Sequence, residues 1–414
     1  MSGRLPIAIV GGGPAGALAA AQLAFGARDV LLFDEKLAWE KPCGGGLTHK
    51  ALQRYPFLAQ GASESNPVAD HPAEHHPVQH RLVEDCELIS PSGKRVRFHL
   101  QHPVAIFSRL ALNGLLLERA RCAGVEGRVD LRQERVTRIE RDGEGWQLVT
   151  PDCCYHASYL ILAAGARNSF RPQFLSAISP RDLMVTAGYF IPGSSSLMQL
   201  QFLRAVTGYI WIFPRVDHVS AGIAGKMGEV PTSELRRTLE HWLEQNNFRL
   251  DGARFYSHIL PSFRSDTFKA LQVCGKGWAM IGDSAGLVDP ITGEGLYYAL
   301  HSAELCAKAI LTGEPHRYQM LIEEELLPEL MLAARVSERF YKGRVLGESV
   351  LERMVSLTGQ SASIRELMSD LFAGNQGYRD LRARLYRILP AVMAESIAGR
   401  LSWPWSSAVG FAPE

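Results

Sequence analysis

The stretch that decides the fold runs from Leu5 to Lys36 and reads "LPIAIVGGGPAGALAAAQLAFGARDVLLFDEK". A short apolar run, a glycine cluster, an alanine-rich segment and a second apolar run follow one another. Short apolar runs bounded by glycine predict buried strands, and the alanine-rich segment predicts a helix between them. This order of strand, turn, helix and strand predicts the start of a parallel α/β sheet.

The glycines of the turn have the spacing of a dinucleotide fingerprint, Gly11-x-Gly13-x-x-Gly16, with Pro14 and Ala15 at the start of the helix. The first glycine allows the tight turn, the second lets a pyrophosphate approach the backbone, and the third lets helix and strand pack closely. The phosphates then lie at the positive N-terminus of the helix. We therefore expect these five residues to bind a dinucleotide.

A carboxylate that binds the ribose is expected about twenty residues after the first glycine. Asp34 stands there, at the end of the second predicted strand, and Glu35 is the alternative. The fingerprint alone does not separate NAD from FAD.

Composition limits the other classes of function. Lys and Arg number 44 and Asp and Glu 43, so the net charge of +1 gives no reason to expect a nucleic-acid partner. Seven cysteines without a CxxC motif favour reduced thiols in a cytoplasmic protein. The uncharged run from Ile7 to Ala27 is long enough to cross a membrane, but its glycines and Pro14 argue against a span.

The rest of the chain alternates between strand and helix patterns. Residues 61–80 predict a loop, and its histidines 71, 75, 76 and 80 have no helix to align them and no further ligands, so we expect no metal site. The remaining expected elements are a hairpin over 87–100, helices over 108–124 and 233–248, strands over 129–139, 146–150 and 155–163, an antiparallel sheet over 183–225, and helices from about 313 onward.

A second glycine cluster, "MIGDSAGLVDPITGEGLYYAL", covers residues 280–300. An aspartate follows a strand here, and a Gly-Glu-Gly turn leads into a helix with one apolar face. Such a turn offers backbone N–H groups and a positive helix end to an anionic group.

Together with Arg109 at the start of a helix, Gly11–Gly16 and Gly282-Asp283 resemble the FAD-binding signature of the p-hydroxybenzoate hydroxylase-type flavoproteins. The resemblance implies that Asp283 binds the ribityl and phosphate region, that Arg109 reaches FAD, and that the segment around Gly293, Gly295 and Leu296 faces the carbonyl edge of the flavin. FAD is therefore the expected cofactor.

Two further motifs narrow the resemblance. "KPCGGGLT" at 41–48 and "YIWIFPR" at 209–215 are similar to motifs of the geranylgeranyl reductase family within that class, over about residues 5–312. The family implies that Cys43, Gly44 and Gly45 lie at the flavin and the substrate, and that Tyr209 and Trp211 form a pocket wall. One departure is Ala164-Gly165, where many relatives have Asp-Gly, so no carboxylate role is carried over there.

The expected architecture is an α/β protein. We expect a Rossmann-like FAD-binding domain from residues 1–175 and 268–312. An inserted α+β substrate domain with an antiparallel sheet is expected over 176–267, with a contribution from 61–100, and a helical region over 313–414.

The expected activity is FAD-dependent reduction of carbon-carbon double bonds in a prenyl substrate, with Cys43, Tyr209 and Trp211 as catalytic residues. Cys43, Tyr209 and water are the candidate proton donors. The alternatives are a flavin monooxygenase or halogenase-like enzyme on a hydrophobic or aromatic small molecule, and a flavin-binding module without catalysis. The electron donor is expected to be NAD(P)H or a ferredoxin-type protein.

The segment 378–405 has apolar residues on one face, five arginines, and Trp403 and Trp405 after it. This pattern fits either an interfacial helix on a membrane or a helix that caps the substrate domain. The expected location is cytoplasmic, with possible peripheral contact to the inner face of a membrane.

Overall fold

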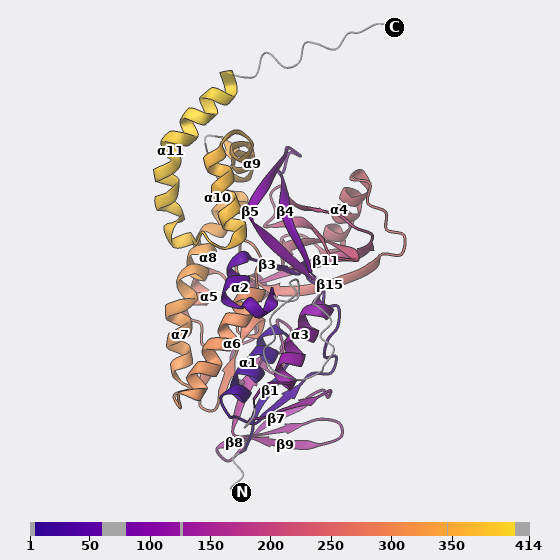
Figure 1. The fold of residues 1–414 in the computed structure, drawn as a ribbon, viewed down its shortest axis with the longest axis vertical. Coiled ribbons are helices and arrows are strands. Elements are labelled where there is room, and N and C mark those ends of the chain that lie inside the picture. The colour runs from indigo at the N-terminus through magenta and orange to yellow at the C-terminus, as the bar shows by residue number, and fades with distance from the viewer. Residues whose placement is uncertain (1–4, 60–79, 125–126, 346, 402–414) are drawn as a thin grey trace.

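The computed structural model describes residues 5–59, 80–124, 127–345 and 347–401. It contains two large sheets built from interleaved parts of the chain, and a group of helices along one side (Figure 1). The histidines 71, 75 and 76 of the predicted loop, and Trp403 and Trp405, lie outside the described residues.

The first sheet has six strands in the order β16-β17-β10-β1-β2-β6 and is parallel except for the β16–β17 pair. Helix α1 contacts both α3 and α6, and the three lie together beside this sheet (Figure 1). The elements of this part are β1 (Ile7–Val10), α1 (Pro14–Phe25), β2 (Val30–Phe33), α3 (Arg109–Arg121), β6 (Val129–Arg132), β10 (Tyr159–Leu162), β16 (Cys274–Gly275), β17 (Trp278–Met280) and α6 (Leu296–Leu311).

The second sheet has eight strands in the order β15-β11-β14-β13-β12-β4-β5-β3, antiparallel except between β12 and β4. One face packs on α4 and the other contacts the C-terminal helices. Its elements are β3 (Gly46–Leu47), β4 (His80–Ile89), β5 (Arg95–Phe107), β11 (Leu183–Pro192), β12 (Leu197–Phe202), β13 (Gly208–Pro214), β14 (His218–Lys226), α4 (Thr232–Gln245) and β15 (Arg254–Pro261).

The C-terminal helices run along one side of the molecule, from α6 to the far edge of the second sheet (Figure 1). Helices α9 and α10 contact β5, and α11 contacts α8, α9 and α10. They are α7 (Arg317–Glu325), α8 (Leu327–Lys342), α9 (Val350–Gln360), α10 (Ala362–Ala373) and α11 (Tyr378–Leu401). No helix in the described ranges is long and apolar enough to cross a membrane.

Smaller elements complete the fold. Helix α2 (His49–Arg54) follows β3 directly, and α5 (Ser265–Lys269) leads back to the first sheet. A separate three-stranded sheet is formed by β7 (Arg138–Asp142), β8 (Gly145–Val149) and β9 (Cys154–Ala157). Short 3-10 helices cover Pro56–Leu58, Arg171–Gln173, Pro180–Asp182 and Gly282–Ser284.

The main expected elements are confirmed, with four differences. The single strand predicted over 129–139 is two strands in two different sheets, β6 and β7, and the one predicted over 155–163 is β9 and β10. The region after 313 also holds a short hairpin, β18 (Arg344–Val345) and β19 (Glu348–Ser349). The second sheet extends past 61–100, since it includes β3 and residues up to Phe107. A periodic pattern gives local conformation but not the partner of a strand, which is why these divisions were missed.

Candidate functional site

The predicted dinucleotide turn joins β1 to α1, and its three glycines have different surroundings. A Cβ built on Gly11 would lie 2.4 Å from the carbonyl oxygen of Ala163, and Gly11 has a φ of +111°. A Cβ on Gly16 would lie 1.8 Å from the Gly11 carbonyl oxygen. A Cβ on Gly13 would meet nothing within 4 Å. Gly11 and Gly16 therefore pack against the protein itself, whereas the backbone at Gly13, before Pro14, borders open space at the N-terminus of α1.

The two candidate ribose ligands lie in different surroundings. Asp34 accepts the backbone N–H of Gly12 at 2.7 Å through Oδ2, so its carboxylate touches the glycine turn. Its Oδ1 accepts the N–H groups of Lys36 and Leu37. Glu35 is half exposed and lies 3.9 Å from Arg135 instead. Asp34 is therefore the carboxylate that the fold brings to the turn.

The second glycine cluster meets the first at the same end of the parallel sheet. A Cβ on Gly282 would lie 3.2 Å from the Cβ of Ala15 in α1. Asp283 lies 3.9 Å from the ammonium of Lys41, which stands two residues before Cys43. A Cβ on Gly295 would lie 3.0 Å from Asp283 Oδ1. The Gly-Asp turn, the fingerprint helix and the start of α6 thus surround one region.

Arg109 has a buried N–H donor without a hydrogen-bond partner in this region. Its side chain is 4 % exposed, and one guanidinium nitrogen donates to Asn113 at 3.3 Å. Its Nε is buried and has no hydrogen-bond partner among the described residues. A buried cation that keeps an unused donor is costly unless a ligand completes it. Arg109 is therefore suited to an anionic or carbonyl group of a bound molecule.

The loop from Asp289 to Gly295 is held by tyrosines from three elements. Tyr209 of β13 donates to the carbonyl of Thr292, and Tyr341 of α8 donates to the carbonyl of Ile291. Tyr378, at the start of α11, donates to the Asp289 carboxylate at 2.8 Å. The second sheet and the C-terminal helices therefore fix this loop together.

The glycines after Cys43 serve close packing. A Cβ on Gly44 would lie 2.6 Å from the ring of Phe213. A Cβ on Gly45 would lie 2.1 Å from the carbonyl oxygen of Phe107, and Gly45 has a φ of +84°. The family resemblance implies that these glycines lie at the flavin and the substrate. They line the cavity described below, but the atoms that lie closest to them belong to the protein.

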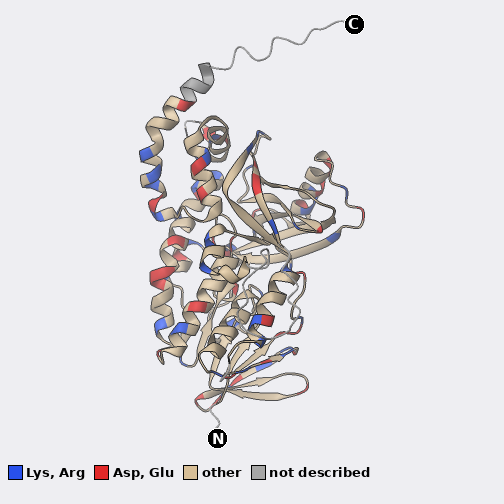
Figure 2. Cartoon of the chain, viewed as in Figure 1, with Lys and Arg blue, Asp and Glu red and all other residues tan. Residues whose placement is uncertain are grey.

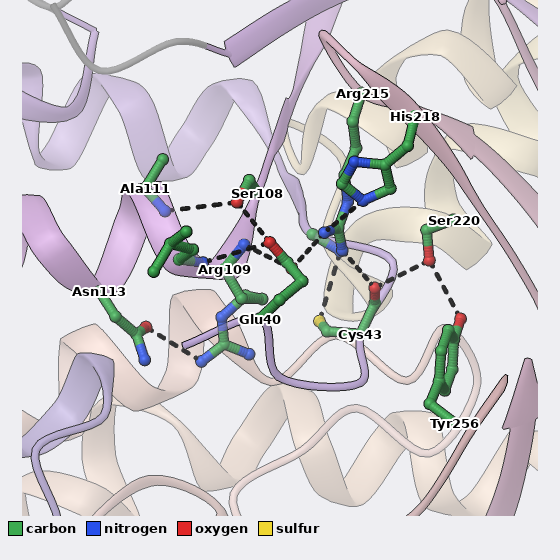
Figure 3. A network of polar contacts seen from close by, with 12 residues as sticks. Glu40, Cys43, Ser108, Arg109, Ala111, Asn113, Arg215, His218, Ser220 and Tyr256 are labelled. Carbon is green, nitrogen blue, oxygen red and sulfur yellow. Dashed lines mark hydrogen bonds and ion pairs between the residues drawn. The ribbon is translucent and has the colours of Figure 1, made fainter. Parts of the chain in front are cut away.

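A buried network holds the Cys43 loop (Figure 3). Arg215 is fully buried and pairs with the Glu40 carboxylate, and it donates to the Cys43 carbonyl at 2.6 Å. Ser220 donates to the same carbonyl at 3.0 Å. The thiol sulfur of Cys43 accepts the backbone N–H of Gly45 at 3.3 Å. The backbone around Cys43 is therefore fixed from the second sheet.

Glu40 also reaches the helix that carries Arg109. Its carboxylate accepts from the hydroxyl of Ser108 and, at 2.9 Å, from the backbone N–H of Arg109 (Figure 3). Burial acts to raise the pKa of Glu40, but Arg215, Ser108 and the Arg109 N–H outweigh it, so the pKa lies below its usual value. Glu40 is thus held as a carboxylate. Sequence reasoning missed both Glu40 and Arg215.

A cavity of about 610 Å³ lies where these parts meet. Tyr209, Trp211 and Phe213 alternate along β13 with Ile210 and Ile212, and the two sets pack on opposite faces of the sheet. The three aromatic residues line the cavity. The rest of its apolar wall comes from the same face of the sheet and from α8 to α11: Met184, Met198, Leu200, Phe202, Phe340, Met354, Met368, Leu371, Phe372 and Leu381.

The cavity brings most of the predicted site residues together. Its lining includes Cys43, Gly44, Gly45, Arg109, Tyr209, Trp211, Asp283, Gly293, Gly295 and Leu296. The fingerprint residues, Asp34, Glu35 and Gly282 are not part of this lining. The residues therefore fall into two groups, a turn beside α1 and a mostly apolar chamber next to it.

Sequence reasoning missed two titratable groups of the chamber. Burial, with smaller contributions from Lys41, Arg167 and Arg109, lowers the pKa of His258 to about 3, so its imidazole is neutral. Burial and the nearby Asp289 raise the pKa of Glu294 to about 7. Among the described residues no cluster of three or more His, Cys, Asp or Glu could hold a metal ion.

No family model matches the chain. The geranylgeranyl diphosphate reductase of Oryza sativa subsp. japonica is 25% identical over 78% of this chain and 70% of that protein. The menaquinone reductase of Mycolicibacterium smegmatis is 24% identical over 94% of this chain and 96% of that protein. Both relatives match more than three quarters of this chain, which supports its resemblance to the geranylgeranyl reductase family.

Solved structures share the fold of this chain. A geranylgeranyl bacteriochlorophyll reductase-like protein from Thermoplasma acidophilum superposes with a TM-score of 0.71 at 19% identity, over 93% of this chain and 99% of that chain. Flavin-dependent halogenases and a p-nitrophenol monooxygenase share the architecture. The expected fold class is therefore confirmed.

Replacement of Arg215 should expose the cost of the buried network. Arg215→Met leaves Glu40 buried without its cation, so we expect the free energy of unfolding to fall by about 3 to 5 kcal/mol. Urea denaturation measures this change. Arg249→Met is the matched control, because its partner Asp251 and Arg249 itself are both exposed, and we expect a change below about 1 kcal/mol.

The pH dependence has a definite sign. The pKa of Glu40 is depressed in the folded state, so its contribution is present above about pH 4.5 and is lost as the pH falls through the folded-state value. The difference between wild type and Arg215→Met should therefore shrink on acidification, and Arg215→Met/Glu40→Gln should recover part of the loss. Equal stability of wild type and Arg215→Met at neutral pH would contradict this role.

Proposed function

We propose that this protein is an FAD-dependent oxidoreductase that saturates carbon-carbon double bonds of a prenyl chain. The observation that carries the proposal is the chamber, whose long apolar wall meets the Cys43 loop and the Asp289–Gly295 loop. Cavities of several hundred Å³ with apolar walls and few polar groups are typical of small-molecule sites. The reductases among the relatives support the same substrate class.

The residues present fit FAD. The open space at Gly13 suits a pyrophosphate at the helix N-terminus, and Asp34 at the turn suits a ribose hydroxyl. The unused Nε of Arg109 suits an acceptor on the cofactor, and Asp283 suits its ribityl region. When bound, FAD supplies the two-electron redox chemistry that no side chain of this protein offers.

The protein's own share is positioning and exclusion of water. Tyr209 and Trp211 form one wall against which a flat or branched apolar chain can pack. Cys43 adds a small polarizable group beside them, and its backbone is fixed by Arg215 and Ser220. Holding an alkene in one orientation contributes to the rate without any covalent step.

The direct test is anaerobic incubation of the reduced protein with a series of prenyl lipids, followed by mass spectrometry. The expected product is the lipid with two added hydrogens. A gain of oxygen in air would instead identify a monooxygenase. This is the alternative because a p-nitrophenol monooxygenase has the same fold. An unchanged lipid under both conditions would mean that the chain only binds flavin.

The electron donor is proposed from the sequence alone. We propose NAD(P)H or a ferredoxin-type protein, and the sequence contains no second dinucleotide fingerprint. Anaerobic bleaching of the flavin absorbance by either donor distinguishes the two.

We further propose that α11 rests on a membrane surface. Leu385, Leu389 and Met393 follow one another at helical spacing and are 42 %, 49 % and 59 % exposed. Arginines stand on the same helix (blue in Figure 2), which suits anionic headgroups. Neighbouring positions of α11 pack on the protein, since Leu381 lines the chamber and Val392 is buried.

Gly13→Val should abolish FAD binding without unfolding the protein. A Cβ at this position meets no protein atom, so the change acts on the place that we assign to the pyrophosphate. Gly11→Val is the contrast, because its side chain would meet the Ala163 backbone and should destabilise the fold. Flavin absorbance and the thermal unfolding of the apoproteins measure the two effects. Normal FAD content in Gly13→Val would refute the assignment.

Cys43→Ser should slow alkene reduction about 10- to 100-fold, or about 1 to 3 kcal/mol, because a hydroxyl is more strongly hydrated than a thiol and a dry chamber disfavours it. FAD content should not change. Cys122→Ser is the control, since Cys122 is exposed. The measurement is the rate of substrate-driven flavin reoxidation without oxygen, and an unchanged rate would make the thiol structural.

Leu385→Gln/Leu389→Gln/Met393→Gln should lose flotation with anionic vesicles at low salt, where electrostatic attraction is strongest. These point changes are preferable to truncation at Gly377, which would remove Tyr378 from Asp289 and Leu381 from the chamber. Leu110→Gln is the control, because Leu110 is 51 % exposed on α3. Equal flotation of all variants, or none by the wild type, would rule the membrane contact out.

A further inference from the structure

The chamber contains one acid that the proposed function does not yet use. Glu294 lies between Gly293, whose Cβ position is 3.1 Å from the Tyr209 hydroxyl, and Gly295, whose Cβ position is 3.0 Å from Asp283. Its side chain belongs to the cavity lining, as do Cys43 and Tyr209. Glu294 therefore belongs to the loop between the aromatic wall and Asp283, and its side chain borders the chamber.

Few groups stabilise the charged form of Glu294. Thr48, the residue that caps α2, donates to Glu294 Oε1 at 3.2 Å. Oε2 has no hydrogen-bond partner within the described residues. Lys50 of α2 lies over the ring of Tyr297 at 4.5 Å and exerts only a weaker pull that favours the charged form.

The negative groups around it act in the opposite direction. Asp289 of the same loop is 4 % exposed and accepts from Tyr378 of α11, and Glu329 of α8 also lines the chamber. Tyr298 of α6 also borders the chamber, but it is neutral and does not stabilise the charged form of Glu294. The N-terminus of α6 favours the carboxylate, yet burial and Asp289 prevail and raise the pKa of Glu294 to about 7.

The other candidate proton donors fit less well. The Tyr209 hydroxyl is committed to the carbonyl of Thr292, and burial raises its pKa far above neutral. His258 is neutral, since burial lowers its pKa to about 3. A general acid works best when its pKa lies near the working pH.

We propose that Glu294 is the general acid of alkene reduction, delivering the proton to the carbon that does not receive the hydride. This inference rests on the proposed function. The π bond opens, and one carbon gains a hydride from the reduced flavin. The other carbon gains the proton of the Glu294 O–H, and the carboxylate left behind recovers a proton from water. The substrate thus gains two electrons and two protons in all.

The first test needs no turnover. Infrared titration of the full chain should show the carbonyl band of a protonated carboxylic acid that disappears with a midpoint of about 7. The band should be absent in Glu294→Gln and present in Glu338→Gln, a control at an exposed position of α8. Retention of the band in Glu294→Gln, or its absence from the wild type, would overturn the proposal.

The second test follows single-turnover reduction of a prenyl alkene without oxygen. The wild-type rate should fall as the pH rises above about 7, because the acid form is lost. Glu294→Gln should be slower by about 10²- to 10⁴-fold and should lose this pH dependence. Glu294→Asp should restore part of the rate and of the pH profile, and flavin content confirms that each variant is loaded.

The outcomes separate the two proposals. If the wild type forms the reduced lipid and Glu294→Gln does so at the same rate and with the same pH profile, Glu294 is not the acid and the proposed function stands. If the wild type forms no reduced lipid with any prenyl chain, the proposed function fails and the role of Glu294 fails with it.

Discussion

The buried ion pair between Glu40 and Arg215 is the constraint on which the site depends. Arg215 follows β13 in the second sheet, whereas Glu40 lies in the loop that leaves the first sheet after β2. Through Glu40 the pair reaches the start of α3 and Arg109, and through Arg215 it reaches the Cys43 carbonyl. One pair therefore fixes both Arg109 and the backbone at Cys43 relative to the aromatic wall. A buried pair of this kind is weak evidence of net stability but a strong determinant of geometry, since loss of either partner leaves a charge without compensation.

The C-terminal helices complete this arrangement from the other side. Tyr341 and Tyr378 bind the loop that Tyr209 also binds, so the segment beside α6 is held between the sheet and the helices. The same helices supply much of the apolar wall of the chamber. Their sequence is therefore free to set the length and shape of the chamber while the glycine turns and the parallel sheet stay unchanged.

The sequence predicts the parts of the site that depend on local chain geometry. The fingerprint at Gly11–Gly16, the helix at Arg109 and the alternation of Tyr209 and Trp211 follow from spacing, and the structure contains each element. The Glu40–Arg215 pair could not be predicted in this way, because 175 residues separate its partners. The division of 129–139 between two sheets was missed for the same reason, since neither strand carries information on its neighbour. The role of Glu294 was missed although Gly293 and Gly295 on either side of it were predicted site residues. Its raised pKa arises from burial and from Asp289, which the sequence does not reveal.

The glycines of the Cys43 loop show how one residue type serves two purposes in the same site. Gly13 leaves a space that a ligand can occupy, whereas Gly44 and Gly45 let Phe213 and the Phe107 backbone approach the loop. The second kind of glycine lets Phe213 of the aromatic wall pack directly beside the residue that follows Cys43. A side chain at Gly45 would therefore damage the chamber by moving the protein rather than by blocking the substrate, and its φ of +84° adds backbone strain to the clash. The surface of the chamber is thus shaped by contacts between protein atoms at Gly44 and Gly45.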